Sequence, residues 1–279
     1  MDTSEAGKPR PRREWIMRAV QPLANRCVAW AARRRVDPMA VVATHALLGL
    51  AAAALLTQQA TAALVATAVL LQLKTLLDNV DGGLARVSGR VTAAGRYLDT
   101  AADLLVNVAL FAALTRHGPV LPAALALVSL TLLLSLDFNL ETRYRELRVA
   151  PPAAPVPLPA GAPSWLLRVP RALYRVLLEP QDRWLRRLDA ALFERAAGRA
   201  YDTAPAPLRL AWNDLYSTAS VVNLGLSTQL AVLGALCLLG RPYAYVIVVF
   251  LQLGYVVAVQ GVRVARLRRL AGEERGRPA

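Results

Sequence analysis

The sequence predicts an all-α integral membrane protein with six transmembrane helices. Hydrophobic residues make up 56% of the 279 residues, and the mean hydropathy is +0.37. A soluble domain of this composition would expose large apolar patches. Uncharged apolar runs recur at lengths that suit helices of roughly 20 residues, which is what a bilayer requires. The net charge of +14 lies between these runs, so we expect membrane lipids as partners and no nucleic acid.

The positions of the six spans follow from the uncharged runs and the turns between them. No residue from 38 to 73 is charged, a stretch long enough for two spans, with a polar break at 57–61. Later breaks fall at 116–119 and 240–243. We therefore expect spans near 39–56, 61–77, 95–115 and 119–137, one within 215–240, and one at 243–262. An even number of spans places both termini on the same side of the membrane.

Basic residues are distributed unevenly between the two sides of this layout. Thirty Lys and Arg residues fall on the side of the termini, and only Arg116 and Arg241 fall on the other, with Lys74 inside the second span. Because cytoplasmic loops carry the excess of basic residues, we expect both termini and the loop between spans two and three to be cytoplasmic. The expected location is the cell inner membrane.

Three cytoplasmic segments are expected outside the spans, namely an N-terminal segment (1–36), an insert (139–214) and a basic tail (263–279). They flank two membrane segments, 37–138 with spans one to four and 215–262 with spans five and six. The N-terminal segment has an apolar stripe at helical spacing, formed by Ile16, Val20, Leu23, Cys27 and Trp30. This stripe predicts an amphipathic helix that lies in the membrane interface.

The insert begins with a linker rich in Pro and Ala at 150–164, which is incompatible with a regular helix. Two further apolar stripes follow, Leu166, Val169, Leu173 and Val176, and then Leu185, Leu188 and Leu192, each with arginines on other faces. We expect these stripes to be helices on the membrane surface. The alternative is a small soluble helical hairpin that packs on itself.

Four aspartates flank the loop between the second and third spans. Asp78 and Asp81 are spaced i,i+3, and Asp99 and Asp103 are spaced i,i+4, so each pair shares one helix face. An ionised Asp near the hydrocarbon costs several kcal/mol unless it is paired, solvated or metal-bound. Oxygen ligands without His or Cys favour Mg²⁺ or Mn²⁺, with Ca²⁺ as an alternative. Sites with two such ions typically carry out phosphoryl chemistry.

Small and basic residues accompany these acids. Gly82 follows the second Asp directly and permits a phosphate to approach the backbone, and Ala85 is also small. Arg86 is positioned to bind a phosphate. Gly95 comes one turn before Asp99, which indicates a close contact with a helix or a ligand.

The complete pattern D-x2-D-G-x2-A-R-x8-G-x3-D-x3-D spans Asp78 to Asp103. It resembles the signature of the CDP-alcohol phosphatidyltransferase family of integral membrane enzymes, and the resemblance covers about residues 10–140, with 215–265 in outline. The family transfers a phosphoryl-alkyl group from a CDP-linked donor to the hydroxyl of a second alcohol, with release of CMP. The resemblance implies phospholipid biosynthesis, a CDP-lipid donor, an alcohol acceptor and a homodimer.

The resemblance also implies roles for individual residues. The ligands of two Mg²⁺ or Mn²⁺ ions would be Asp78, Asp81, Asp99 and Asp103. Asp103 would in addition be the catalytic general base that acts on the acceptor hydroxyl. The CDP-donor site would consist of Gly82, Ala85, Arg86, Thr92 and Gly95.

The chain departs from the family pattern at the start of the first span. Many members carry a Pro-Asn…Thr motif there, but Met39 and Val42 follow Pro38 in this chain. Thr44 or His45 is a candidate substitute for the missing polar contacts. The alternative for His45 is a hydrogen-bonded core histidine.

The candidates for binding the acceptor alcohol are Arg143, Arg145 and Arg148, which follow the fourth span. They are placed to bind a phosphorylated acceptor, and they equally fit the positive-inside rule. The sequence favours transfer of a phosphatidyl group from CDP-diacylglycerol to a polar alcohol, phosphorylated or not. One alternative is transfer of a small head group from a CDP-alcohol to diacylglycerol. Another is an ion-coupled transporter that uses the aspartates for ion binding.

Overall fold

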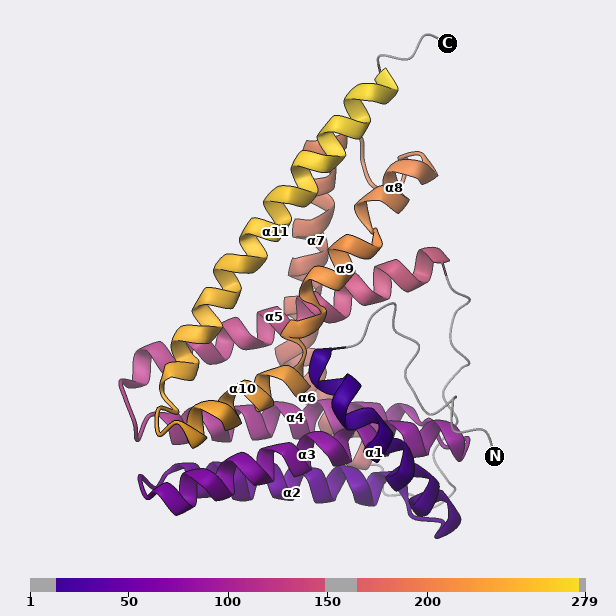
Figure 1. The fold of residues 1–279 in the computed structure, drawn as a ribbon. Coiled ribbons are helices and arrows are strands. Elements are labelled where there is room, and N and C mark those ends of the chain that lie inside the picture. The colour runs from indigo at the N-terminus through magenta and orange to yellow at the C-terminus, as the bar shows by residue number, and fades with distance from the viewer. Residues whose placement is uncertain (1–13, 149–164, 276–279) are drawn as a thin grey trace.

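The computed structural model describes residues 14–148 and 165–275, and this part of the chain contains helices and no strand (Figure 1). The helices are α1 (Trp15–Arg33), α2 (Pro38–Leu56), α3 (Thr61–Val87), α4 (Ala93–Leu114), α5 (Val120–Arg148), α6 (Trp165–Leu173), the π-helix η2 (Tyr174–Leu178), α7 (Glu179–Ala197), α8 (Ala206–Trp212), α9 (Leu215–Val221), the 3₁₀-helix η3 (Val222–Leu224), α10 (Leu226–Leu238) and α11 (Ala244–Arg275). The expected all-α class is confirmed.

Six helical stretches within the described residues are long and apolar enough to cross a membrane, as the sequence predicts. They are α2, α3, α4, α5, the composite stretch Ala206–Leu238 and the stretch Ala244–Glu273 of α11. Three helices extend beyond their expected ends, because α3 continues to Val87, α5 to Arg148 and α11 to Arg275. The fifth stretch is interrupted where Asp214 caps α9 and Gly225 caps α10.

The turns α2–α3, α4–α5 and α10–α11 meet at one end of the bundle (Figure 1, left). His117 Nε2 lies 2.6 Å from the carbonyl oxygen of Leu56, and the Tyr243 hydroxyl donates to the carbonyl oxygen of Pro119 at 2.6 Å. A Cβ atom on Gly118 would lie 2.5 Å from the Tyr243 ring, so this close approach requires glycine. The three connections therefore lie together, as an alternating series of spans requires.

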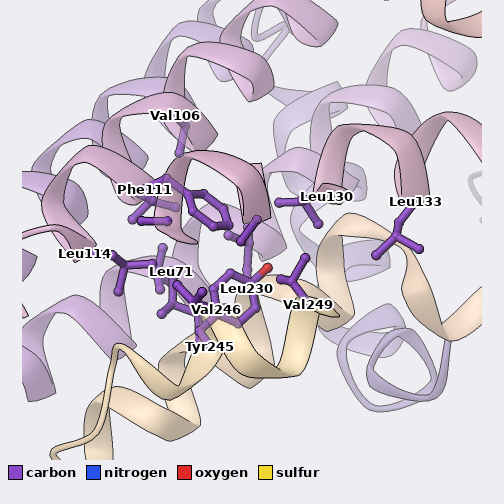
Figure 2. Close-up of a cluster of buried hydrophobic side chains, with 14 of the residues drawn as sticks. Leu71, Val106, Phe111, Leu114, Leu130, Leu133, Leu230, Tyr245, Val246 and Val249 are labelled. Carbon is purple, nitrogen blue, oxygen red and sulfur yellow. The ribbon is translucent and has the colours of Figure 1, made fainter. Parts of the chain in front are cut away.

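The main hydrophobic core lies between α3, α4, α5, α10 and α11 (Figure 2). The rings of Phe111 and Tyr245 pack with centroids 5.7 Å apart, among side chains that include Leu71 and Val249. The buried Tyr245 hydroxyl donates to Gln229 Oε1 at 3.0 Å, which satisfies it without water. This core brings the last two spans against the helices that carry the aspartates.

Helix α1 packs against α3 and α10 with a face of small and slender residues that includes Ala24, Val28 and Ala31. At its start, the Glu14 carboxylate accepts hydrogen bonds from the backbone N–H (2.7 Å) and the hydroxyl (2.8 Å) of Thr228, in the first turn of α10. Two members of the expected apolar stripe, Leu23 and Trp30, remain exposed. The helix therefore presents one face to the protein and a separate apolar face outward.

Within the described residues, the two predicted apolar stripes of the insert do not fold back on each other as a hairpin, although the end of α7 packs against α8, where Trp212 Nε1 donates to Asp189 Oδ2 at 3.0 Å. Segments α6, η2 and α7 follow one another without a break, and they contact α4, α5 and α11. The exposed apolar residues Val169, Leu173 and Val176 lie on α6 and η2. The Pro- and Ala-rich linker predicted at 150–164 lies outside the described residues.

Two tyrosines attach η2 to the bundle. The ring of Tyr174 packs against Tyr97 of α4, with centroids 5.5 Å apart. The Tyr174 hydroxyl donates to Asp182 Oδ2 at 2.9 Å, and Asp182 Oδ1 accepts from Asn139 of α5. Burial, together with the hydrogen bond to Asp182, raises the pKa of Tyr174 to about 12. Because Tyr97 lies two residues before Asp99, the insert reaches the helix that carries the second pair of acids.

Candidate active site

A tight turn joins α3 to α4 and brings their acidic ends together. Gly89 adopts a φ of +66°, which glycine tolerates best. Its N–H donates to the carbonyl of Arg86 at 3.2 Å, and the N–H of Arg90 donates to the carbonyl of Ala85 at 2.8 Å. This is the Schellman arrangement that ends many helices. The whole connection therefore occupies only residues 88–92.

The donor-site candidates lie on both sides of this turn. Thr92 caps α4, because its Oγ1 accepts from the N–H of Gly95 at 3.0 Å. On α3, Arg86 Nη1 lies 3.4 Å from the position that a Cβ on Gly82 would occupy. The arginine therefore covers the bare backbone of Gly82, and Ala85, half-buried on α3, leaves space beside it. A cationic side chain and a helix N-terminus thus flank the acids.

Helix α2 packs against both α3 and α4 and inserts one side chain between their acids. His45 Nε2 lies 3.5 Å from Asp99 Oδ1, 3.6 Å from Asp81 Oδ2 and 4.0 Å from Asp78 Oδ1. The imidazole is fully buried, whereas the Asp99 side chain is 38% exposed. Carboxylates from two helices therefore converge on one point, as the spacing predicts.

The fourth aspartate has a cationic partner. Lys74 Nζ donates to Asp103 Oδ1 at 2.7 Å, and the lysine side chain is only 1% exposed. Gly49 of α2 leaves space for it, because a Cβ there would lie 3.3 Å from Lys74 Cδ and 2.6 Å from a methyl group of Val106. Since Gly49 lies one turn after His45, one face of α2 both supplies the imidazole and accommodates the Lys74 side chain.

Residues 37–168 match the family model described as CDP-alcohol phosphatidyltransferase. They form a CDP-alcohol phosphatidyltransferase domain. No curated protein matches the chain. The matched segment contains α2 to α5, all four aspartates, His45 and Lys74. The family resemblance is therefore confirmed, and it indicates a membrane transferase of phospholipid synthesis that uses a CDP-alcohol, rather than an ion-coupled transporter.

The donor set of the transferase domain fits divalent metal ions. One ligand atom from each of His45, Asp78 and Asp99 lies within 4.8 Å of the other two. Within the described part of the chain, the buried Asp99 Oδ1 and both ring nitrogens of His45 have no hydrogen-bond partner. Buried polar atoms without partners are costly, and a bound cation would satisfy them.

His45 and Lys74 are the two residues of this centre that the motif does not include. The sequence leaves Thr44 and His45 as alternatives, and the structure separates them: the exposed Thr44 donates to the carbonyl of Ala40, whereas His45 faces the acids. His45 is fully buried, as the alternative of a core histidine expects, but the polar atoms nearest to its Nε2 are carboxylate oxygens of the motif. The signal for Lys74 is its charge within an apolar span, which marks a functional side chain.

The three acceptor candidates of the transferase domain lie on α5 and have protein partners. Arg145 pairs with Glu141 at 3.6 Å. Arg148 donates to two backbone carbonyls at the end of α8, at 2.7 and 2.8 Å. The guanidinium of Arg143 stacks 5.1 Å from the ring centre of Tyr201, whose pKa is raised by burial. Arg145 and Arg148 thus also help to hold the structure together.

Proposed function

We propose that the protein transfers a phosphatidyl group from CDP-diacylglycerol to the hydroxyl of a polar alcohol, with release of CMP. The observation that carries this proposal is the convergence of the motif carboxylates from α3 and α4 on His45, inside the matched transferase domain. Such a concentration of negative charge at the end of apolar spans is costly. It is suited to a polyanionic substrate that arrives with divalent cations.

The proposed metal ligands are Asp78, Asp81, Asp99 and Asp103. When bound there, two Mg²⁺ or Mn²⁺ ions would neutralise the donor diphosphate and the departing CMP. Arg86 would bind a phosphate of the donor through its guanidinium. The free N–H groups at the start of α4, near Thr92, would add donors for the diphosphate. Gly82 has no side chain and therefore leaves room for the Arg86 guanidinium beside the backbone of α3.

Asp103 is proposed as the general base. Lys74 holds its Oδ1, so the other oxygen, Oδ2, would accept the proton of the acceptor hydroxyl. The acceptor oxygen then forms the new bond to the phosphorus of the phosphatidyl group, and the bond from this phosphorus to the CMP oxygen breaks. No covalent bond to the enzyme is required. Lys74 keeps the carboxylate in place during the transfer.

We further propose that both termini, the acids and the insert face the cytoplasm. The support is the excess of basic residues at the end of the bundle opposite the turns that carry Arg116 and Arg241. The apolar face of α6 and η2 would rest on lipid. Because Tyr174 of η2 packs against Tyr97 of α4, this face would also border the path by which a lipid substrate reaches the acids. Arg143 of α5 would be the main residue that binds a phosphorylated acceptor, with Arg145 and Arg148 as further contacts. A homodimer is the proposed assembly.

The test uses the purified protein with Mg²⁺ or Mn²⁺ and two sets of substrates. The first set is CDP-diacylglycerol with a panel of alcohols that includes phosphorylated ones, and the second is CDP-linked small alcohols with diacylglycerol. CMP release and the mass of the lipid product are measured. We expect CMP and a new phospholipid in the first set only. Product in the second set alone would show that the protein transfers a small head group to diacylglycerol. CMP release in neither set would contradict the proposal.

A further inference from the structure

His45 is the only titratable residue of α2, and its environment is unusual. The side chain has an exposed fraction of 0%, and neither ring nitrogen has a hydrogen-bond partner within the described residues. Its Nε2 lies within 4.0 Å of oxygens of Asp78, Asp81 and Asp99. A buried imidazole without hydrogen bonds is costly, so packing alone does not account for a histidine here.

The distances match those within the coordination shell of a metal. Ligand atoms that are each about 2.0–2.2 Å from one ion lie about 3–4.3 Å apart, depending on the angle between the bonds. The three separations from His45 Nε2 are 3.5, 3.6 and 4.0 Å. One ion can therefore contact this nitrogen and the neighbouring carboxylate oxygens without a large movement of the helices.

We propose that His45 is itself a metal ligand, so that Nε2 coordinates one of the divalent ions together with Asp78 and Asp99. This inference rests on the proposed metal-dependent function, and it adds a nitrogen donor to a site that the sequence motif describes as all oxygen. Mg²⁺ strongly favours oxygen ligands, whereas imidazole suits ions of the transition series. The nitrogen therefore shifts the preference of this site from Mg²⁺ toward Mn²⁺.

The competing role for His45 is that of a protonated counter-charge. An imidazolium would neutralise part of the negative charge of the acids and would leave when a metal ion enters. In that case the ring nitrogen and the ion never bond. The two roles differ in one measurable property, which is a direct bond between nitrogen and metal in the loaded protein.

The test is pulsed electron paramagnetic resonance of the Mn²⁺-loaded full chain in detergent, with ¹⁵N-labelled histidine and an affinity tag free of histidine. The chain contains two histidines, and His117 lies at the opposite end of the bundle, bonded to the carbonyl of Leu56. We expect a ¹⁵N hyperfine coupling of a bound imidazole in the unmodified protein and in His117→Gln. The coupling should be absent in His45→Ala.

Metal affinity gives an independent measurement. Loss of supporting residues around metal ligands lowers affinity about 10–100-fold, so His45→Ala should weaken Mn²⁺ binding about ten-fold or more. Mg²⁺ binding should fall less, so the Mn²⁺ to Mg²⁺ affinity ratio decreases. No ¹⁵N coupling in the unmodified protein would overturn the proposal, and this spectrum decides even where the variant fails to fold. CMP release is measured in parallel. Coupling without CMP release would contradict the proposed function alone. Metal-dependent CMP release without coupling would contradict only the proposal that His45 is a ligand.

Discussion

Replacement of Lys74 by methionine tests whether the buried pair with Asp103 holds the centre together. The Lys74 side chain is 1% exposed, and its Nζ lies 2.7 Å from Asp103 Oδ1. Removing one partner of a buried ion pair typically costs about 3–5 kcal/mol, because the other charge stays buried without compensation. Asp103 remains 21% exposed, so water screens part of its charge. We therefore expect Lys74→Met to lower the free energy of unfolding by about 3 kcal/mol, the low end of that range.

The assay is equilibrium unfolding by SDS titration in mixed micelles, with a chelator present so that no metal compensates the aspartate. Asp103→Asn in the Lys74→Met background removes the stranded charge, so the double variant should return to within about 1 kcal/mol of the unmodified protein. Arg145→Met is the matched control, because its pair with Glu141 is longer, at 3.6 Å, and its side chain is 24% exposed. Its expected cost is below about 1 kcal/mol.

Two outcomes would refute this reasoning. Lys74→Met could prove as stable as the unmodified protein in chelator, which would mean that the pair contributes nothing to the fold. Alternatively, the loss could persist in the double variant with Asp103→Asn, which would place the cost in packing and not in charge. In the expected case, saturating Mn²⁺ should reduce the defect of Lys74→Met, because bound metal then compensates Asp103.

Three further predictions follow from the same structure. Asp103→Asn should lower the rate of CMP release about 10²–10⁴-fold, and added metal should not rescue it. Asp81→Asn should recover partly in a Mg²⁺ titration. Near-normal turnover of Asp103→Asn at high metal would show that Asp103 is chiefly a metal ligand. Gly49→Ala would place a Cβ 2.6 Å from a buried valine of α4, so the free energy of unfolding should fall by about 1–3 kcal/mol. Gly254→Ala, with no atom within 4 Å of the added Cβ, is the control and should be neutral or stabilising. Glu14→Ala should cost about 1–3 kcal/mol in the same SDS titration, because it leaves the start of α10 without its acceptor, and Glu14→Gln, which keeps a carbonyl oxygen there, should cost less.

Local sequence patterns were sufficient to predict the number of spans and the positions of the acids on their helices. Apolar runs and turn residues are local signals, and the i,i+3 and i,i+4 spacings place Asp78 with Asp81 and Asp99 with Asp103 on shared faces wherever the helices lie. The lengths of α3 and α5 were harder to predict from the sequence. Both helices continue into polar sequence, to Val87 and Arg148, because a helix does not end where its hydrophobicity ends.

The roles of His45 and Gly49 depend on tertiary packing, which no local pattern contains. Their position in the centre results from α2 packing against both α3 and α4. Helix α1 is a second example. Its apolar stripe was visible in the sequence, but the face that packs on α3 and α10 consists of residues such as Ala24 and Ala31, whose small size gives little periodic signal.

The most direct test of the central claim is metal-dependent CMP release from CDP-diacylglycerol, compared between the unmodified protein and Asp99→Asn. Asp99 comes from α4 and lies 3.5 Å from His45 Nε2, beside Asp81 of α3, so its replacement removes the α4 carboxylate from the cluster around His45 and leaves the α3 acids in place. We expect CMP release that requires Mg²⁺ or Mn²⁺, stops with chelator and falls at least about 10²-fold in Asp99→Asn. CMP release that persists in chelator, or that is unaffected by Asp99→Asn, would show that the converged acids do not bind a metal ion needed for the transfer.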